Sequence, residues 1–324
     1  MNNVIVMNLG GIFLKTKILL FGDPGIDDSF AIMYALMNPN IELVGIVTGY
    51  GNVTKDQATA NANYLLQLAN KQDVPVIPGA ANPVQEKDVI YYPEIHGANG
   101  IGPIHPPSNL TYQEYTFDTI REIINRYPNE IVIVDIGRST SLATAFNLFQ
   151  DEMTKVKAVY VMGGAFFVPG NATALAEANF YGDPTSSNYI LRYAQNLTIT
   201  PLNVTQFALL TSEMVDYLIE ESNSPFVSLL SPIFEYYFKF YQEKNPGIQG
   251  APIHDLLTVM VVIAPSIAEY VYYDAQVIDG PGGARGMSYI DIRPTSPKGK
   301  TRIAVKLDYE KFVEEFMRVM LYIS

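Results

Sequence analysis

The stretch "KILLFGDPGIDDSFA", residues 17–31, decides the fold and raises the first question about function. Its apolar start is typical of a buried β-strand, and the segment from about residue 27 to residue 37 has the pattern of a helix. Between the two, Asp23, Asp27 and Asp28 lie within six residues beside a Pro-Gly turn. Carboxylates crowded at the end of a buried strand repel one another, so these three are either solvated or hold a cation.

Outward from this stretch, apolar runs alternate with helical patterns through the first two thirds of the chain. The sequence predicts strands at residues 17–22, 41–49, 74–79, 131–137, 156–164 and 197–203. It predicts helices at about residues 27–37, 55–70, 117–126, 141–148 and 186–194. Apolar strands separated by helices indicate a mostly parallel sheet covered on both faces. The predicted fold class is therefore α/β, with a Rossmann-like open sheet.

The last third of the chain, from Thr211 onward, is more helical and rich in aromatic residues. A buried helix is predicted to begin at His254, and the C-terminal part has the pattern of two strands and a closing helix. No linker, low-complexity tract or internal repeat interrupts the sequence. We therefore predict a single domain over residues 1–324, with residues 1–16 as an N-terminal extension.

The composition restricts the possible functions. The 324 residues carry a net charge of −12 and no run of Lys or Arg, which argues against nucleic-acid binding. Because the chain has no cysteine, disulfides, thiolate metal sites and a cysteine nucleophile are excluded. A metal would be held by oxygen atoms or by one of three histidines: His96, His105 and His254. Without a signal-peptide pattern or a long apolar run, we predict a cytoplasmic protein that does not contact membranes.

Polar residues follow several predicted strands. Asp23, Asn52, Thr140 and Asn171 each lie just past the carboxyl end of an apolar run. In open α/β sheets, ligands bind beyond these ends because the connecting loops gather there. We therefore expect the four residues to converge at one edge of the sheet.

Two of the polar segments have both a functional and a purely structural interpretation. The aspartates of residues 23–28 suit Ca²⁺ or Mg²⁺, or they cap the start of a helix. Asn171, Glu177 and Asn179 have the groups needed to hold the hydroxyls of a sugar, or they belong to a polar loop. The sequence alone leaves these alternatives open.

The two segments that contain His254 and His96 also have two interpretations each. His254 and Asp255 pair a possible proton donor with a possible ligand, or they cap a helix that carries a half-buried histidine. His96 lies in the glycine-containing segment "IHGANGIG", residues 95–102, which indicates either a loop that closes over a site or an ordinary surface loop.

These segments match one family in order and spacing: the sequence resembles the inosine/uridine-type nucleoside hydrolases. The family signature Asp-x-Asp-Pro-Gly-x-Asp-Asp corresponds to "FGDPGIDD", residues 21–28. The match spans roughly residues 17–260 and has these further members: Tyr50-Gly51-Asn52, Ile95-His96-Gly97, Gly137-Arg138-Ser139-Thr140, Met162-Gly163-Gly164, Asn171 to Asn179, and His254-Asp255. The resemblance implies the nucleoside hydrolase fold and the cleavage of ribonucleosides into free base and ribose.

The resemblance also implies a Ca²⁺ site. Asp23, Asp28 and Asp255, together with the backbone carbonyl of Thr140, would bind the ion, and water and ribose hydroxyls would complete its coordination. Asp27 would act as the base that accepts a proton from the attacking water.

Further roles carry over to the substrate-binding residues. Asn179 and Asp27 would hold the ribose 2′-hydroxyl, and Asp255 the 3′-hydroxyl. Asn171 and Glu177 would hold the 5′-hydroxyl.

The remaining residues of the implied site act near the metal and the base. Asn52 would lie near the ion, and His96 belongs to the segment that closes over the substrate. His254 would protonate the leaving nitrogen of the base, with Tyr241 as the second candidate. An oxocarbenium-like ribosyl cation is the expected intermediate state, and carboxylate and amide oxygens stabilise such a cation.

The chain departs from the family pattern at Phe21, where the signature has its first aspartate. This change removes a carboxylate that would orient Asp23 or Asn52. Two alternatives therefore accompany the predicted hydrolase: a catalytically weak nucleoside- or ribose-binding protein, and a metal-dependent phosphohydrolase. The second lacks a glycine-rich phosphate loop or a Lys/Arg cluster. The resemblance further suggests a homodimer or a homotetramer.

Overall fold

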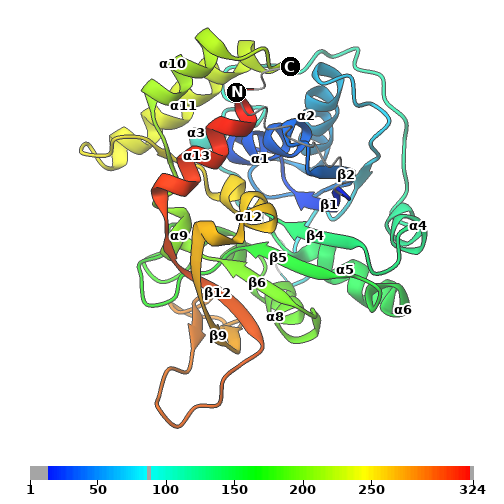
Figure 1. Cartoon of the computed structure of the whole chain (residues 1–324). Coiled ribbons are helices and arrows are strands. Elements are labelled where there is room, and N and C mark those ends of the chain that lie inside the picture. Colours follow the sequence, from blue (N-terminus) through cyan, green and yellow to red (C-terminus); the bar gives the residue numbers. More distant parts are fainter. Residues whose placement is uncertain (1–13, 86–88, 322–324) are drawn as a thin grey trace, which may run out of the picture.

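A sheet of eight strands, in the order β3-β2-β1-β4-β5-β6-β12-β9, forms the centre of the protein. The computed structural model describes residues 14–85 and 89–321 (Figure 1). Neighbouring strands pair in parallel, except that β9 lies antiparallel to β12 at one edge. The strands of this sheet are β1 (Thr16–Gly22), β2 (Ile41–Thr48), β3 (Val76–Pro78), β4 (Ile131–Asp135), β5 (Ala158–Met162), β6 (Leu197–Thr200), β9 (Ala268–Tyr273) and β12 (Thr301–Leu307).

Helices cover both faces of the sheet (Figure 1). They are α1 (Ile26–Met37), α2 (Lys55–Leu68), α3 (Pro93–His96), α4 (Thr119–Arg126), α5 (Thr140–Leu148), α6 (Gln150–Met153), α7 (Ala178–Gly182), α8 (Pro184–Tyr193), α9 (Leu202–Thr205), α10 (Ser212–Glu221), α11 (Val227–Lys244), α12 (His254–Ile263) and α13 (Tyr309–Met320), with a 3₁₀ helix at Pro265–Ile267. Two short antiparallel pairs lie outside the main sheet: β7 (Leu209–Leu210) with β8 (Ala251–Pro252), and β10 (Ala275–Val277) with β11 (Ser288–Ile290).

The two faces of β1 show why its sequence is apolar without alternation. Ile18 and Leu20 pack into a core that includes α1, α11, α12 and α13, whereas Leu19 and Phe21 pack into a second core against α4, α5 and α8. Because both faces of the strand are buried from Ile18 onward, the four residues 18–21 are all apolar. The polar residues of the chain are therefore displaced to the ends of the strands.

The predicted α/β class and mostly parallel sheet are confirmed, and each predicted strand of the first two thirds is present. The prediction for residues 197–203 was too long, because β6 ends at Thr200 and α9 starts at Leu202. No strand was predicted at β9, whose aromatic residues follow closely on α12. Of the predicted N-terminal extension, residues 1–13 lie outside the described residues, and β1 already begins at Thr16. The single domain stays a prediction.

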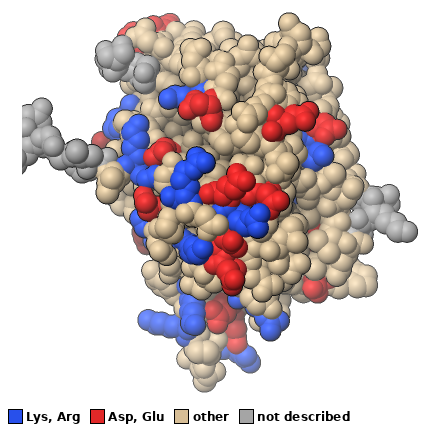
Figure 2. All heavy atoms as spheres, turned by 90° about the vertical axis from the view of Figure 1, so that its right-hand side faces the viewer, with Lys and Arg blue, Asp and Glu red and all other residues tan. Residues whose placement is uncertain are grey.

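The surface carries charges of both signs. On the face shown in Figure 2, Lys and Arg side chains are interspersed with Asp and Glu side chains and do not form a field of one sign. The pair Lys17 and Glu130, with nitrogen and oxygen 2.7 Å apart, is of this kind. This face therefore lacks the extended positive field that attracts a nucleic-acid backbone. Among the described residues, no helix has the length and apolar character needed to cross a membrane.

Candidate active site

The turn between β1 and α1 is built around Gly25 and Asp28. The Asp28 carboxylate accepts the backbone N–H of Gly25 at 3.0 Å and that of Asp23 at 3.1 Å. Gly25 is required by close packing, since a Cβ there would lie 2.6 Å from Nδ1 of His96 and 2.7 Å from Nδ2 of Asn52. Asp28 therefore caps the start of α1, which is one of the two interpretations of these aspartates. The same turn also brings His96 and Asn52 close to the aspartates.

Three buried carboxylates lie together at the carboxyl end of the sheet. Asp27, Asp28 and Asp255 each offer an oxygen, and these oxygens all lie within 4.8 Å of one another. Two residues of α1 thus meet the first turn of α12, which is distant in sequence. A divalent cation is the simplest group that offsets three carboxylates in so small and so buried a volume.

Asp23 lies beside this group but is not part of it. One of its carboxylate oxygens accepts the backbone N–H of Asn52, whose side-chain amide reaches Asp28 at 2.9 Å. The other oxygen, Oδ1, is buried without a hydrogen-bond partner, as is Oδ1 of Asp27. Buried carboxylate oxygens rarely lack partners, so the donor set fits a metal ion that would supply them.

Burial raises the pKa of each of these four carboxyl groups, and the neighbouring carboxylates raise it further for Asp23, Asp27 and Asp255. The pKa of Asp27 rises to about 7. In the absence of metal, the cluster therefore binds protons that the unfolded chain releases at the same pH.

This proton uptake predicts the pH dependence of the metal-free protein. An aspartate with a raised folded-state pKa favours the folded state below its unfolded pKa of about 3.9, and this stability is lost as the pH rises through the folded value. For Asp27 the window runs from about pH 4 to about pH 7. We expect the melting temperature in chelator to fall between pH 5 and pH 8, as measured by thermal unfolding.

Two controls belong to this measurement. The Asp27→Asn variant should show a shallower slope, and added Ca²⁺ should flatten the wild-type slope because the ion takes the place of the protons. A metal-free melting temperature that rises over this pH range would contradict the assignment.

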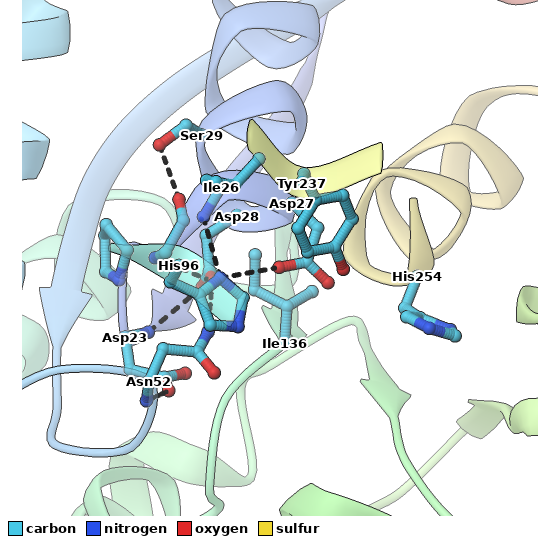
Figure 3. Close-up of polar contacts among 12 residues, drawn as sticks. Asp23, Ile26, Asp27, Asp28, Ser29, Asn52, His96, Ile136, Tyr237 and His254 are labelled. Atoms are coloured by element: carbon cyan, nitrogen blue, oxygen red, sulfur yellow. Dashed lines mark hydrogen bonds and ion pairs between the residues drawn. The ribbon is translucent and has the colours of Figure 1, made fainter. Parts of the chain in front are cut away.

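His96 is buried at the end of α3 and faces the acidic cluster (Figure 3). Its Nδ1 accepts the backbone N–H of Ile26 at 3.1 Å, so the ring proton resides on Nε2. Burial, together with a smaller effect of His254, lowers the pKa of His96 to about 3 and keeps the ring neutral. The contact of 3.8 Å between Nδ1 and Oδ1 of Asp27 is therefore not an ion pair. The expectation of an ordinary surface loop is wrong for this residue.

A chain of hydroxyl and imidazole groups leads away from Asp27. Tyr237 contacts Asp27, and its hydroxyl lies 3.4 Å from that of Tyr241, which in turn lies 3.2 Å from Nε2 of His254. Nδ1 of His254 lies 2.9 Å from Oγ1 of Thr205. Burial lowers the pKa of His254 to about 4, so its imidazole is neutral near pH 7 and can pass a proton along this chain.

The segment before α7 presents the predicted sugar-binding residues. Both oxygens of Glu177 accept backbone N–H groups, among them those of Asn179 at 2.7 Å and Gly164 at 2.9 Å. Nδ2 of Asn179 donates to the carbonyl of Ile136 at 3.0 Å, and Oδ1 of Asn171 accepts the N–H of Ala178 at 2.9 Å. These local bonds match the polar-loop interpretation, yet they also fix the side chains in one orientation.

A cavity of about 290 Å³ joins these groups. It is lined by the following predicted residues: Asp27, Asn52, His96, Asn171, Glu177, Asn179, Tyr241, His254 and Asp255. The cavity is also lined by Tyr237 and by four residues to which the sequence assigns no role: Tyr92, Ile136, Met162 and Phe240. The spacing of Tyr237 and Tyr241, one turn apart on α11, was the available signal. His105 is exposed and does not line the cavity.

Thr140 is not among the residues that line this cavity. Its hydroxyl donates to Asp183 at 2.7 Å, and its carbonyl accepts the hydroxyl of Thr144 at 2.8 Å within α5. A carbonyl oxygen can accept a second contact, so the implied role of the Thr140 carbonyl as a metal ligand stays a prediction. The carbonyl that follows β4 and faces the site is that of Ile136, which lies beside the aspartates in Figure 3 and contacts Asn179.

Comparison with known proteins agrees with this geometry. A family model described as inosine-uridine preferring nucleoside hydrolase matches residues 18–314. The chain belongs to this family. As a nucleoside hydrolase it is an N-glycosidase, an enzyme that splits nucleosides with water.

Three relatives show how closely the nucleoside hydrolase follows known members. The inosine-uridine preferring nucleoside hydrolase of Crithidia fasciculata is 34% identical over 306 residues, which cover 92% of this chain and 95% of that protein. Uridine nucleosidase 1 of Arabidopsis thaliana is 33% identical, with 78% of this chain and 76% of that protein covered. A purine-preferring ribonucleoside hydrolase from Gardnerella vaginalis superposes with a TM-score of 0.86 at 30% identity, covering 94% and 98% of the two chains.

Proposed function

We propose that this nucleoside hydrolase binds one Ca²⁺ at its acidic cluster and cleaves the N-glycosidic bond of ribonucleosides there. The observation that carries the proposal is the group formed by Asp27, Asp28 and Asp255, buried at the base of a cavity whose neighbouring carboxylate oxygens lack partners. Asp23 and the backbone carbonyl of Thr140 would complete the protein ligands. When bound, the ion would lower the pKa of a water molecule and help to fix the ribose.

Asp27 is the proposed general base. Its Oδ1 is free of hydrogen-bond partners and it lines the cavity, so it can accept a proton from a water molecule there. The water oxygen forms a bond to C1′ of the ribose, one water proton passes to Asp27, and the bond from C1′ to the base nitrogen breaks. The leaving nitrogen then needs a proton.

The ribose is held by amide groups that the protein has already oriented. Because Nδ2 of Asn179 donates to the carbonyl of Ile136, its amide oxygen is available to accept the 2′-hydroxyl. Because Oδ1 of Asn171 accepts a backbone N–H, its Nδ2 is available to donate to the 5′-oxygen. Glu177, whose oxygens accept backbone N–H groups, supplies negative charge to the ribosyl cation.

His254 and Tyr241 are proposed to protonate the leaving base. Both line the cavity. The imidazole would give the proton on Nε2 to the leaving nitrogen and regain one from the Tyr241 hydroxyl, which recovers it through Tyr237 from Asp27. The names of the relatives refer to uridine, to inosine and uridine, and to purines. We therefore propose a ribonucleoside as the substrate and do not specify its base. A cytoplasmic location, a role in nucleoside salvage and a homodimer or homotetramer are further proposals, which rest on family resemblance.

Product analysis tests this function. The protein with Ca²⁺ should convert inosine or uridine into free base and reducing sugar in equal amounts, as followed by chromatography and a reducing-sugar assay. Inorganic phosphate should not affect the rate, because water is the attacking group. Binding of nucleoside without release of ribose would instead favour the weak nucleoside-binding protein that the substitution at Phe21 suggests.

A further inference from the structure

Asp135 is a buried carboxylate that the proposed reaction does not use. It ends β4 with 1% of its surface exposed, and its Oδ2 has no hydrogen-bond partner. The carboxylate bonds with the side chain of Ser139 and with the backbone N–H of Gly137. Its bonds therefore close the turn that follows β4, at the carboxyl end of the sheet where the site lies.

The register of the sheet places Asp135 directly beside Phe21. The two are paired neighbours on the parallel strands β1 and β4, so their side chains point to the same face of the sheet. Phe21 packs there into the apolar core, as do Ile131 and Ile133, which precede Asp135 on that face of β4. Asp135 is thus a carboxylate among apolar side chains. It is also the neighbour of Phe21, the position at which the family signature has an aspartate.

The turn held by Asp135 touches two parts of the site. A Cβ on Gly137 would lie 2.3 Å from Oδ1 of Asp23, so the glycine backbone packs directly against the unpartnered oxygen of that aspartate. The carbonyl of Ile136 receives the amide of Asn179 at 3.0 Å. Displacement of residues 136–138 would therefore move both the metal-facing aspartate and the amide that holds the ribose.

We propose that Asp135 is a positioning residue that takes over, from the neighbouring strand, the task of the carboxylate absent at Phe21: it holds residues 136–138 against Asp23 and Asn179. The inference rests on the proposed function of the same site.

Relocating the carboxylate tests the proposal. Asp135→Val fits the apolar row but removes both bonds to the turn, and we expect Ca²⁺ affinity, measured by titration calorimetry, to fall about 10- to 100-fold. Adding Phe21→Asp to this variant should restore most of the affinity. Asp183→Asn, which alters another buried carboxylate at the N-terminal cap of α8, should leave the affinity within about twofold of wild type. The same measurements on Asp135→Asn replace those on Asp135→Val if that variant does not fold.

Two results would overturn the inference: Ca²⁺ affinity unchanged in Asp135→Val, or lost affinity that Phe21→Asp does not restore. Melting temperatures in chelator separate this effect from general loss of stability, since a purely structural role would lower them without changing metal affinity. If the wild type binds no Ca²⁺, the Ca²⁺ site of the proposed function is wrong. The inference about Asp135 is then tested by the KM for inosine. A tenfold rise reversed by Phe21→Asp supports it, and an unchanged KM overturns it.

Discussion

Replacing Asp27 by asparagine is expected to lower kcat for ribonucleoside hydrolysis by about 10²- to 10⁴-fold. The substitution keeps the shape of the side chain but removes the group that accepts the water proton. Because Asp27 also belongs to the group of three carboxylates, Ca²⁺ affinity should fall as well. Ribose release is therefore measured with Ca²⁺ at saturation, so that the loss in kcat reports the missing base.

Asp183→Asn is the matched control for Asp27. Asp183 is also buried, but its carboxylate bonds to Thr140 and Ser186 and does not line the cavity. This variant should lower the melting temperature and leave kcat within a few fold of wild type. A kcat of Asp27→Asn within tenfold of wild type, at saturating Ca²⁺, would remove Asp27 from the role of base.

The second large effect is expected at His254. His254→Ala should lower kcat for inosine about 10²-fold or more, because the purine leaves poorly without a proton. The same variant should cleave p-nitrophenyl riboside at close to the wild-type rate, since nitrophenolate is stable as an anion. The ratio of the two losses, measured by product release for each substrate, reports leaving-group protonation.

Tyr241→Phe isolates the hydroxyl in the same chain of contacts. It keeps the ring that packs against Tyr237 and removes the contact of 3.2 Å to His254. We expect a smaller, inosine-selective loss than for His254→Ala. Equal losses on inosine and on the aryl riboside in His254→Ala would show that His254 supports the fold or the ribose, and not the leaving base.

The sheet and much of the cavity could be predicted because their signals are local. Apolar runs ending in polar residues marked the strand ends, and the order of motifs indicated Asp27, His254 and Asp255 as members of one site. The structure brings these residues to a common cavity from α1 and α12.

Two properties could not be predicted from the sequence: the direction in which a backbone carbonyl points, and the register in which distant strands pair. A motif identifies Thr140 but does not show which backbone carbonyls the turn after β4 directs toward the cavity, and that of Ile136, which contacts Asn179, was not indicated. The pairing of Phe21 with Asp135 is set by strand register between segments more than a hundred residues apart. The burial of His96 follows from its packing against Tyr237, which local patterns do not show.

The most direct test of the account is the recovery of hydrolysis as Ca²⁺ is added back to chelated protein. Chelated protein should release no ribose from inosine or uridine above the uncatalysed rate, and activity should return in proportion to Ca²⁺ up to one bound ion per chain. Full activity in protein shown by metal analysis to contain no divalent ion would contradict the central claim that the cluster of Asp27, Asp28 and Asp255 acts through a bound metal.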